Sequence, residues 1–225
     1  MGRPTEEDPR YQRVRGQLRD ALVELAQVKP VENISVSELT QVAGVSRTTF
    51  YKHGTTPVQF LSDMLVEDLR PYLERMVEAM ATPTEDYLLK WRAIYIELLE
   101  AIAGNRAVNE IIVAGEGQAA VLAEIQKGLR EMFSEYVHEF RRHLEGDSVS
   151  ELWTEMAVEQ QVHNLVVVAT SWLRTGMVDS PEVVVNTYLS LAPPWQLARF
   201  SAAGMASMKR ARSVAELAAR AHAVK

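Results

Sequence analysis

Apolar residues recur every three or four positions along nearly the whole chain, which is the spacing of one face of an α-helix. Caps, glycines and prolines divide this pattern into successive segments. We therefore expect helices over about residues 9–26, 35–43, 46–53, 57–80, 88–104, 105–114, 118–141, 149–175 and 181–191. No segment alternates in the manner of a β-strand, so the sequence predicts an all-α fold.

Local signals place several of these boundaries. Ser35 and Glu38 form the S-x-x-E pattern of a capping box at the start of the second helix. Gly44 suits the left-handed conformation of a sharp turn after that helix, and Ser46 is the expected cap of the third. Pro71 interrupts the fourth helix, but the apolar period continues beyond it, so we expect a kink there and not an end.

The second and third expected helices are joined by a three-residue turn, which is the plan of a helix-turn-helix. In that motif the second helix presents polar side chains to the major groove of DNA. Arg47 can bind either a guanine edge or a phosphate, and for His53 a phosphate contact and packing in the turn are both open. The candidate DNA-contacting residues are Ser35, Ser46, Arg47, Thr48, Thr49, Tyr51, Lys52, His53 and Thr56.

The distribution of charge agrees with a single DNA-facing end. The net charge is −6, but residues 9–53 carry seven basic and four acidic side chains. A basic head on an acidic body is expected if only one end approaches phosphate. The last thirty residues are also basic, and we interpret them as a solvated helix face, with a disordered arm or an extra DNA contact as alternatives.

Composition excludes several other classes. The sequence contains no cysteine, no apolar block behind a basic start and no apolar stretch long enough to span a membrane. These features predict a cytoplasmic protein without a membrane partner. The five histidines show no spacing such as H-E-x-x-H, so we expect no metal site, and we expect no cofactor.

The segment ISVSELTQVAGVSRTTFYKH, residues 34–53, resembles the DNA-binding signature of the TetR (tetracycline-repressor) family of bacterial transcription regulators. The resemblance lies in the cap at Ser35, the turn at 43–46 and the Thr-Phe-Tyr run at 49–51. The two long helices around RTGMVDSP, ending YLSLAPPW, are similar to the dimer-forming pair of that family. The chain departs from the family pattern at residues 54–57, where an aromatic residue and a lysine are usual.

The resemblance implies a homodimer that binds a pseudo-palindromic DNA operator and releases it when a small molecule enters a cavity in the C-terminal body. The candidate pocket residues are Trp91, Tyr95, Leu98, Ile102, Phe133, Trp153, Met156 and His163. Core packing is the alternative for the apolar ones. For His163 the alternative is an interface position, where it pairs with Glu159 one helical turn away.

We divide the chain into a helix-turn-helix domain (residues 1–55), a ligand-binding and dimerisation domain (56–195) and a basic extension (196–225). The predicted function is that of a ligand-responsive DNA-binding regulator, a repressor released by a small hydrophobic molecule, with the fourth helix transmitting the signal. A DNA-binding regulator without a small ligand is one alternative. An all-α enzyme or carrier is another, but the sequence shows no catalytic constellation for it.

Overall fold

The computed structural model describes residues 8–81, 87–106, 108–109, 118–142 and 149–197. The N-terminal elements are α1 (Pro9–Ala26), the 3-10 helix η1 (Val31–Asn33), α2 (Val36–Val42) and α3 (Arg47–Phe50). The others are α4 (Pro57–Ala81), α5 (Tyr87–Gly104), α7 (Gln118–Arg142), α8 (Glu151–Arg174), α9 (Pro181–Leu191) and α10 (Pro194–Leu197). The predicted all-α fold is confirmed, since the described ranges contain helices and no strand.

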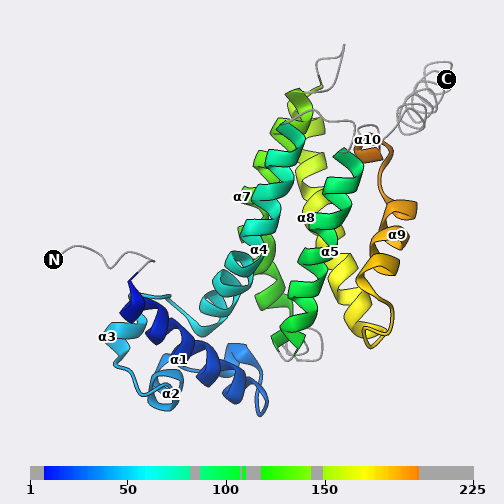
Figure 1. Cartoon of the computed structure of the whole chain (residues 1–225). Coiled ribbons are helices and arrows are strands. Elements are labelled where there is room, and N and C mark those ends of the chain that lie inside the picture. The colour runs from blue at the N-terminus through cyan, green and yellow to red at the C-terminus, as the bar shows by residue number, and fades with distance from the viewer. Residues whose placement is uncertain (1–7, 82–86, 107, 110–117, 143–148, 198–225) are drawn as a thin grey trace, which may run out of the picture.

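The helices form a small head and a larger body (Figure 1). The head consists of α1, α2 and α3 with the start of α4, and α4 runs from it into a bundle with α5, α7 and α8, while α9 lies at the side of that bundle. The pair α4 and α7 packs most closely. A Cβ added at Gly128 of α7 would lie 2.9 Å from a methyl carbon of Val66 of α4, so glycine permits this approach.

The predicted boundary signals of the head are present. The side chain of Ser35 accepts a hydrogen bond from the backbone N–H of Glu38, and the Glu38 carboxylate accepts one from the backbone N–H of Ser35 at 2.9 Å. A hydrogen bond from Lys29, with those from Ser35, lowers the pKa of Glu38 to about 2, so this capping carboxylate stays ionised. Gly44 adopts φ +66°, the left-handed conformation expected of the turn.

An apolar core fixes the head on the start of α4. Phe50 of α3 is completely buried, and its ring centroid lies 6.1 Å from that of Phe60 in α4. Leu18 of α1 and Leu39 of α2 are buried in the same cluster. Burial of each such side chain contributes about 1.5–3 kcal/mol, which holds the short α3 in place although four residues are too few to be stable alone.

The body core agrees with the helical periodicity. Helix α4 continues through Pro71, so the expectation that this proline does not end the helix is confirmed. An aromatic stack joins α5 to α9, because the rings of Trp91 and Tyr95 lie 4.9 Å apart and those of Tyr95 and Tyr188 lie 5.4 Å apart.

Three features differ from the sequence-based expectations. Helix α3 ends at Phe50 and residues 51–53 form a turn, in which the N–H of Lys52 bonds to Thr49 three residues back. Val42, which helical spacing places on the apolar face of α2 with Leu39, is 43% exposed. Beyond α9, where only a stop was expected, α10 places Gln196 in the core, where its side chain bonds to Gln161 and Tyr188. The basic segment 198–225 and most of the helix expected over 105–114 lie outside the described residues.

Candidate functional site

The exposed surface of the head is formed by α3 and the turn after it. Tyr51 is 60% exposed, although it follows the buried Phe50. The other candidate residues that face solvent are Ser35, Ser46, Arg47, Thr48, Lys52 and Thr56. Two cations, an aromatic hydroxyl and several alcohols are therefore accessible on α3 and the segments next to it, and groups of this kind can bind phosphates and base edges.

Two hydrogen bonds tie this surface to the fold. The guanidinium of Arg47 donates to the hydroxyl of Ser37 in α2 at 3.0 Å, so the arginine is oriented while it remains exposed. The hydroxyls of Ser46 and Thr49 lie 2.8 Å apart, and Thr49 is half-buried. Such constraints reduce the conformational entropy that ordering these side chains on DNA would cost.

Besides Ser46, which caps α3, two more of the predicted contact residues cap helices. The hydroxyl of Ser35 is part of the capping box of α2, where it donates a hydrogen bond to the carboxylate of Glu38 at 2.8 Å. The hydroxyl of Thr56 accepts a hydrogen bond from the backbone N–H of Gln59 at 3.1 Å, at the start of α4. Both are exposed and able to contact a phosphate, but each has a structural role that explains its presence without DNA.

His53 does not belong to this exposed surface. It is only 8% exposed, and its ring stacks on that of Tyr11 in α1 with centroids 4.1 Å apart. Of the two possibilities left open by the sequence, packing in the turn is therefore the one that the structure favours. Burial lowers the pKa of His53, and the neighbouring charges of Arg15 and Lys52 lower it further.

The lowered pKa of His53 predicts a pH dependence of head stability. The folded head disfavours the protonated ring, so its contribution to stability is complete above the ordinary pKa of about 6.5 and is lost as the pH falls below it. We expect the wild type to lose stability relative to His53→Phe between pH 7.5 and 5.5 in urea unfolding. His163→Gln, at an exposed position, is the control. Identical pH dependence of the wild type and His53→Phe would contradict this assignment.

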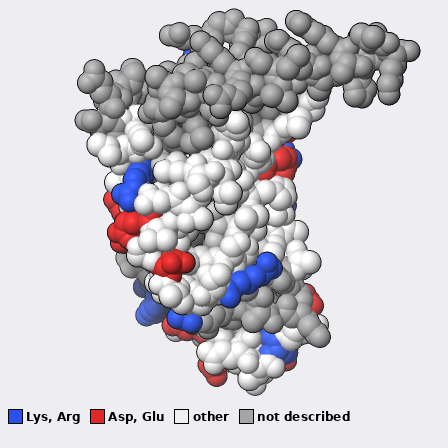
Figure 2. Space-filling view, turned by 90° about the vertical axis from the view of Figure 1, so that its right-hand side faces the viewer, with Lys and Arg blue, Asp and Glu red and all other residues white. Residues whose placement is uncertain are grey.

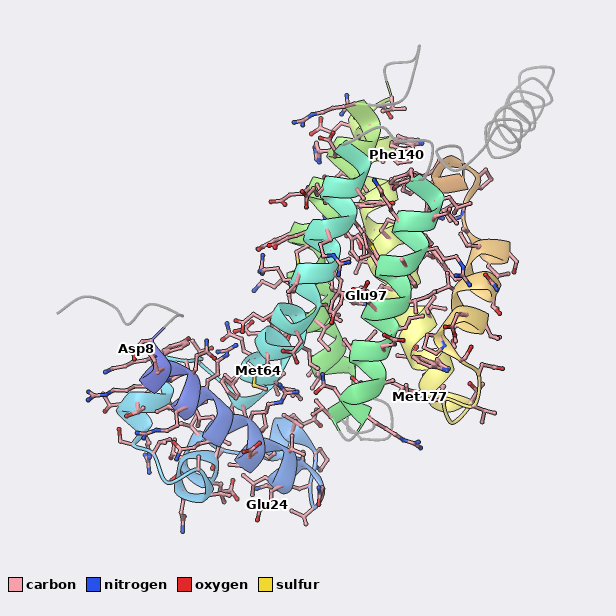
Figure 3. The ribbon with its side chains drawn as sticks, in the orientation of Figure 1. Asp8, Glu24, Met64, Glu97, Phe140 and Met177 are labelled. Carbon is pink, nitrogen blue, oxygen red and sulfur yellow. The ribbon has the colours of Figure 1, made fainter. Side chains whose placement is uncertain are left out.

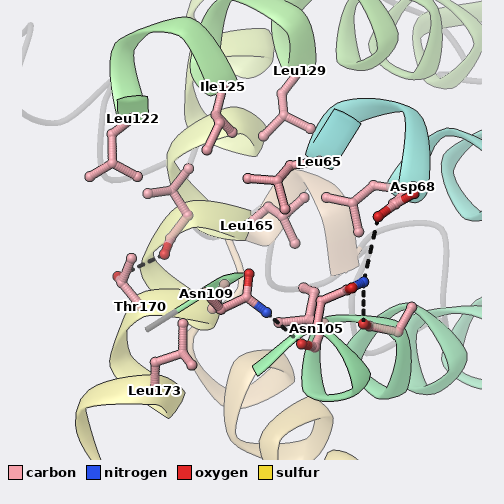
Figure 4. Close-up of a pocket in the computed structure, with 15 residues that line it drawn as sticks. Leu65, Asp68, Asn105, Asn109, Leu122, Ile125, Leu129, Leu165, Thr170 and Leu173 are labelled. Atoms are coloured by element: carbon pink, nitrogen blue, oxygen red, sulfur yellow. Dashed lines mark hydrogen bonds between the residues drawn. The ribbon is translucent and has the colours of Figure 1, made fainter. Parts of the chain in front are cut away.

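A cavity of about 80 Å³ lies in the body between α4, α5, α7 and α8 (Figure 4). Most of its wall is aliphatic, from residues such as Leu65, Leu129 and Leu165. The polar side chains on the wall are Asp68, Asn105, Asn109 and Thr170. An apolar cavity with a few polar groups is the usual form of a small-molecule site. Sequence reasoning missed these polar residues, because they come from separate segments and form no motif.

The polar end of this cavity also contacts the head. Arg19 of α1 donates a hydrogen bond to the side-chain oxygen of Asn105, just after α5, and lies 3.3 Å from the carboxylate of Asp68 in α4. Nearby, Arg15 of α1 forms an ion pair with Glu67 of α4. The buried Met64 marks the same junction between head and body (Figure 3). The cavity and the head therefore share a hydrogen-bonded cluster.

The predicted pocket residues fall into different environments. Ile102 lines the cavity, whereas Leu98 is buried in the core away from it. Trp91, Tyr95 and Phe133 border a separate gap of only about 10 Å³, which is enough for one water molecule.

The remaining predicted pocket residues lie elsewhere on α8. Trp153 packs on Trp195 at 5.5 Å between ring centroids. Met156 is 65% exposed and His163 is exposed, so neither belongs to the cavity of this chain, because α8 turns these positions outward. His163 lies 3.7 Å from the carboxylate of Glu159, which also pairs with Arg130 of α7.

The surface of α8 and α9 is apolar and grooved. Between these helices lies an open groove of about 270 Å³, and Val167, Val184 and Leu191 are on its wall. Figure 2 shows that the face containing α9 carries few charged side chains over its middle. The large apolar side chains exposed on α8 and α9 are Leu152, Met156, Val167, Val183 and Leu191. Such an extended apolar surface is characteristic of a protein interface.

Among the described helices, none has the length and apolar character needed to cross a membrane. Within the same residues, no three histidine or acidic side chains are grouped so that they could bind a metal ion.

Residues 90–193 match the TetR-type family model described as the transcriptional regulator C-terminal region. No curated protein matches the chain in sequence. The structure shows a helix-turn-helix head joined to a larger helical body (Figure 1). Residues 90–193 are thus similar in sequence to the C-terminal region of TetR-type regulators, and the chain shares its fold with a solved TetR-family regulator.

Solved structures share this fold over most of the chain. A putative TetR-family transcriptional regulator from Syntrophomonas wolfei is 16% identical, with a TM-score of 0.58 over 85% of this chain and 97% of that one. The fatty acid degradation regulator FadR from Bacillus halodurans is 18% identical, with a TM-score of 0.53 over 88% and 98%. FadR from Bacillus subtilis, solved with stearoyl-CoA, is 19% identical, with a TM-score of 0.51 over 78% and 96%. At these identities the similarity concerns the fold.

Proposed function

We propose that the protein is a homodimeric transcriptional repressor that leaves its operator when a small, mainly apolar molecule binds in the body. The observation that carries this proposal is the cluster of Arg19, Asp68 and Asn105, which joins the wall of the cavity to α1 of the head. A ligand that moves the residues of this wall changes the contacts that hold α1 on the body. Because α1 and α3 pack in the same apolar core, the position of α3 changes with that of α1.

The DNA-binding part of the proposal rests on the exposed polar surface of α3. Each protomer would insert this short helix into one major-groove half-site, and a twofold dimer would read a pseudo-palindrome with half-sites spaced by whole helical turns. Arg47 and Tyr51 are the side chains best placed to reach base edges, while Lys52 suits a phosphate. Any shift in the separation of the two heads would then weaken the complex.

The ligand-responsive part rests on the cavity. A ligand shifts the equilibrium between operator-bound and released conformations only by its difference in affinity for the two. In the alternative regulator without a small ligand, the cavity would have no function and the cluster would be only structural. The cavity wall and its contact with α1 favour the ligand-responsive form, and nothing in the described residues favours an enzyme.

The dimer part is supported by the exposed apolar groove between α8 and α9. In a twofold interface one substitution acts twice, so Val167→Glu should place two carboxylates in an apolar contact. We expect this variant to be monomeric at concentrations where the wild type is dimeric, and to lose operator affinity. Val28→Glu, at an exposed position of the head, is the control for oligomeric state. Analytical ultracentrifugation measures this, and a dimeric Val167→Glu protein would contradict the proposed interface.

The proposal as a whole is tested by selecting genomic DNA fragments on the purified protein. We expect enrichment of a pseudo-palindromic sequence that binds two protomers, or four if two dimers share a site. The complex should weaken steeply with added salt, because bound phosphates release counterions. Enrichment of no sequence by protein that has been unfolded and refolded to remove bound ligand would reject the proposed function.

A further inference from the structure

The polar groups on the cavity wall have one chemical character in common, because the side-chain amides of Asn105 and Asn109 and the hydroxyl of Thr170 already donate hydrogen bonds to protein oxygens. The amide N–H of Asn105 lies 3.3 Å from the carbonyl oxygen of Ala101, and that of Asn109 bonds to the carbonyl of Ile102. The hydroxyl of Thr170 donates to the carbonyl of Val166 at 2.7 Å. What the wall offers to a ligand is therefore acceptors: the amide oxygens of the two asparagines and the carboxylate of Asp68 (Figure 4).

The charge on the cavity wall also favours a ligand that donates hydrogen bonds and carries a positive charge. Among the described residues that line the cavity, Asp68 is the only charged one, and it is negative. A carboxylate or phosphate ligand would place like charge next to Asp68, and the neighbouring cation, Arg19, already pairs with that carboxylate, so an anion is unfavourable in a site walled by leucine and isoleucine. A ligand with a positive, hydrogen-donating group would find both an opposite charge and acceptor oxygens.

In this structure a cation from the head occupies these acceptors. The guanidinium of Arg19 donates to the side-chain oxygen of Asn105 and lies 3.3 Å from Asp68. The side chain of Arg19 is 30% exposed and that of Asp68 is 36% exposed, and ion pairs at this degree of exposure are weak because water screens them. A second cation anchored by apolar contacts inside the cavity can therefore displace Arg19.

We propose that the effector is a lipophilic amine, whose hydrocarbon part enters the cavity and whose ammonium group replaces the Arg19 guanidinium at Asp68 and Asn105. The displacement removes a polar contact that connects α1 to the end of α5 and so loosens the head from the body. This inference rests on the proposed function for its regulatory meaning. The binding chemistry stands on the cavity alone.

Calorimetry without DNA tests the binding chemistry with three probes of equal chain length: hexylamine, hexanol and hexanoate. With the wild type we expect hexylamine to bind at least tenfold more tightly than either of the others. Each methylene that the cavity buries should tighten binding about fourfold along the series from butylamine to hexylamine. Equal or tighter binding of hexanol or hexanoate would overturn the proposal.

Two variants identify the polar partner. Asp68→Asn keeps the shape of the side chain and should remove most of the preference for the amine over the alcohol. Arg19→Gln removes the competing cation and should tighten hexylamine binding several-fold, a gain that misfolding cannot produce. Unchanged or weaker amine binding by Arg19→Gln would overturn the displacement, and thermal melting of each variant verifies that it is folded.

Operator binding is measured separately, so the two proposals can fail independently. Saturating hexylamine should weaken the wild-type operator complex at least tenfold in fluorescence anisotropy and have less effect on Asp68→Asn. If no DNA sequence is selected, the proposed function fails while calorimetry still decides the amine site. If hexylamine binds as expected but leaves operator affinity unchanged, release by an amine is overturned while operator binding stands.

Discussion

Replacing Arg47 and Lys52 together with alanine should weaken operator binding by about 1–3 kcal/mol or more per half-site. Both side chains are exposed, on α3 and the turn that follows it, and both carry a positive charge toward solvent. Loss of these charges also reduces the number of counterions released, so the slope of log K against log salt should become shallower by about 1–2 per protomer. Fluorescence anisotropy on the selected operator over a salt series measures both quantities.

The matched control is Lys90→Ala, which removes one exposed charge from α5 in the body. Its effect on operator affinity should be small, because Lys90 lies on the body and its attraction to the DNA phosphates acts over a long distance, where salt screens it. Thermal melting of the double variant should match that of the wild type, since neither side chain is in the core. Wild-type affinity and salt slope in the double variant would show that another surface binds the DNA.

The second large effect is expected at Phe50, which joins α3 to the rest of the head. Its side chain is completely buried against Phe60, so Phe50→Ala removes apolar contacts and leaves a cavity. Substitutions of this kind cost about 3–5 kcal/mol, a large part of the stability of a small domain. We expect loss of operator binding and a separate, early unfolding transition of the head in urea.

Leu89→Ala is the control for Phe50→Ala, because Leu89 is a large apolar residue of α5 that is 66% exposed. It should change the free energy of unfolding by less than about 0.5 kcal/mol. If Phe50→Ala unfolded at the wild-type urea concentration, α3 could not be held by the packing described here. Its orientation would then need another explanation.

Sequence-based reasoning succeeded where the structure depends on local signals. The capping box at Ser35, the left-handed turn at Gly44 and the continuation of α4 through Pro71 were all predicted, and all three are present. Each is decided by the chemistry of residues within one or two helical turns, so the sequence alone carries the information.

It failed where distant segments decide the outcome. Val42 lies on the apolar side of α2 by spacing, but within the described residues it is 43% exposed. Met156 has the periodicity of a core residue, yet it is 65% exposed on α8. Both errors arise because periodicity tells which residues share a face and not whether anything packs on that face.

In the candidate site, too, the residues of one continuous segment could be predicted, and those brought together from distant segments could not. The exposed candidates on α3 come from one continuous segment and could be predicted, apart from His53, whose burial depends on stacking with Tyr11. The polar wall of the cavity could not be predicted, because Asp68 and Asn105 are separated in sequence and are brought together by the packing of α4 on α5. Arg19, which completes the cluster, belongs to yet another helix.

The most direct test of the central claim is photo-crosslinking from a benzophenone side chain placed at Tyr51, which is 60% exposed beside α3. Position 89, which is 66% exposed on the body, provides the matched control. We expect efficient crosslinking to the operator from position 51, none from position 89, and competition by unlabelled operator but not by scrambled DNA. Crosslinking from position 89 and not from position 51 would contradict the assignment of α3 as the DNA-reading helix.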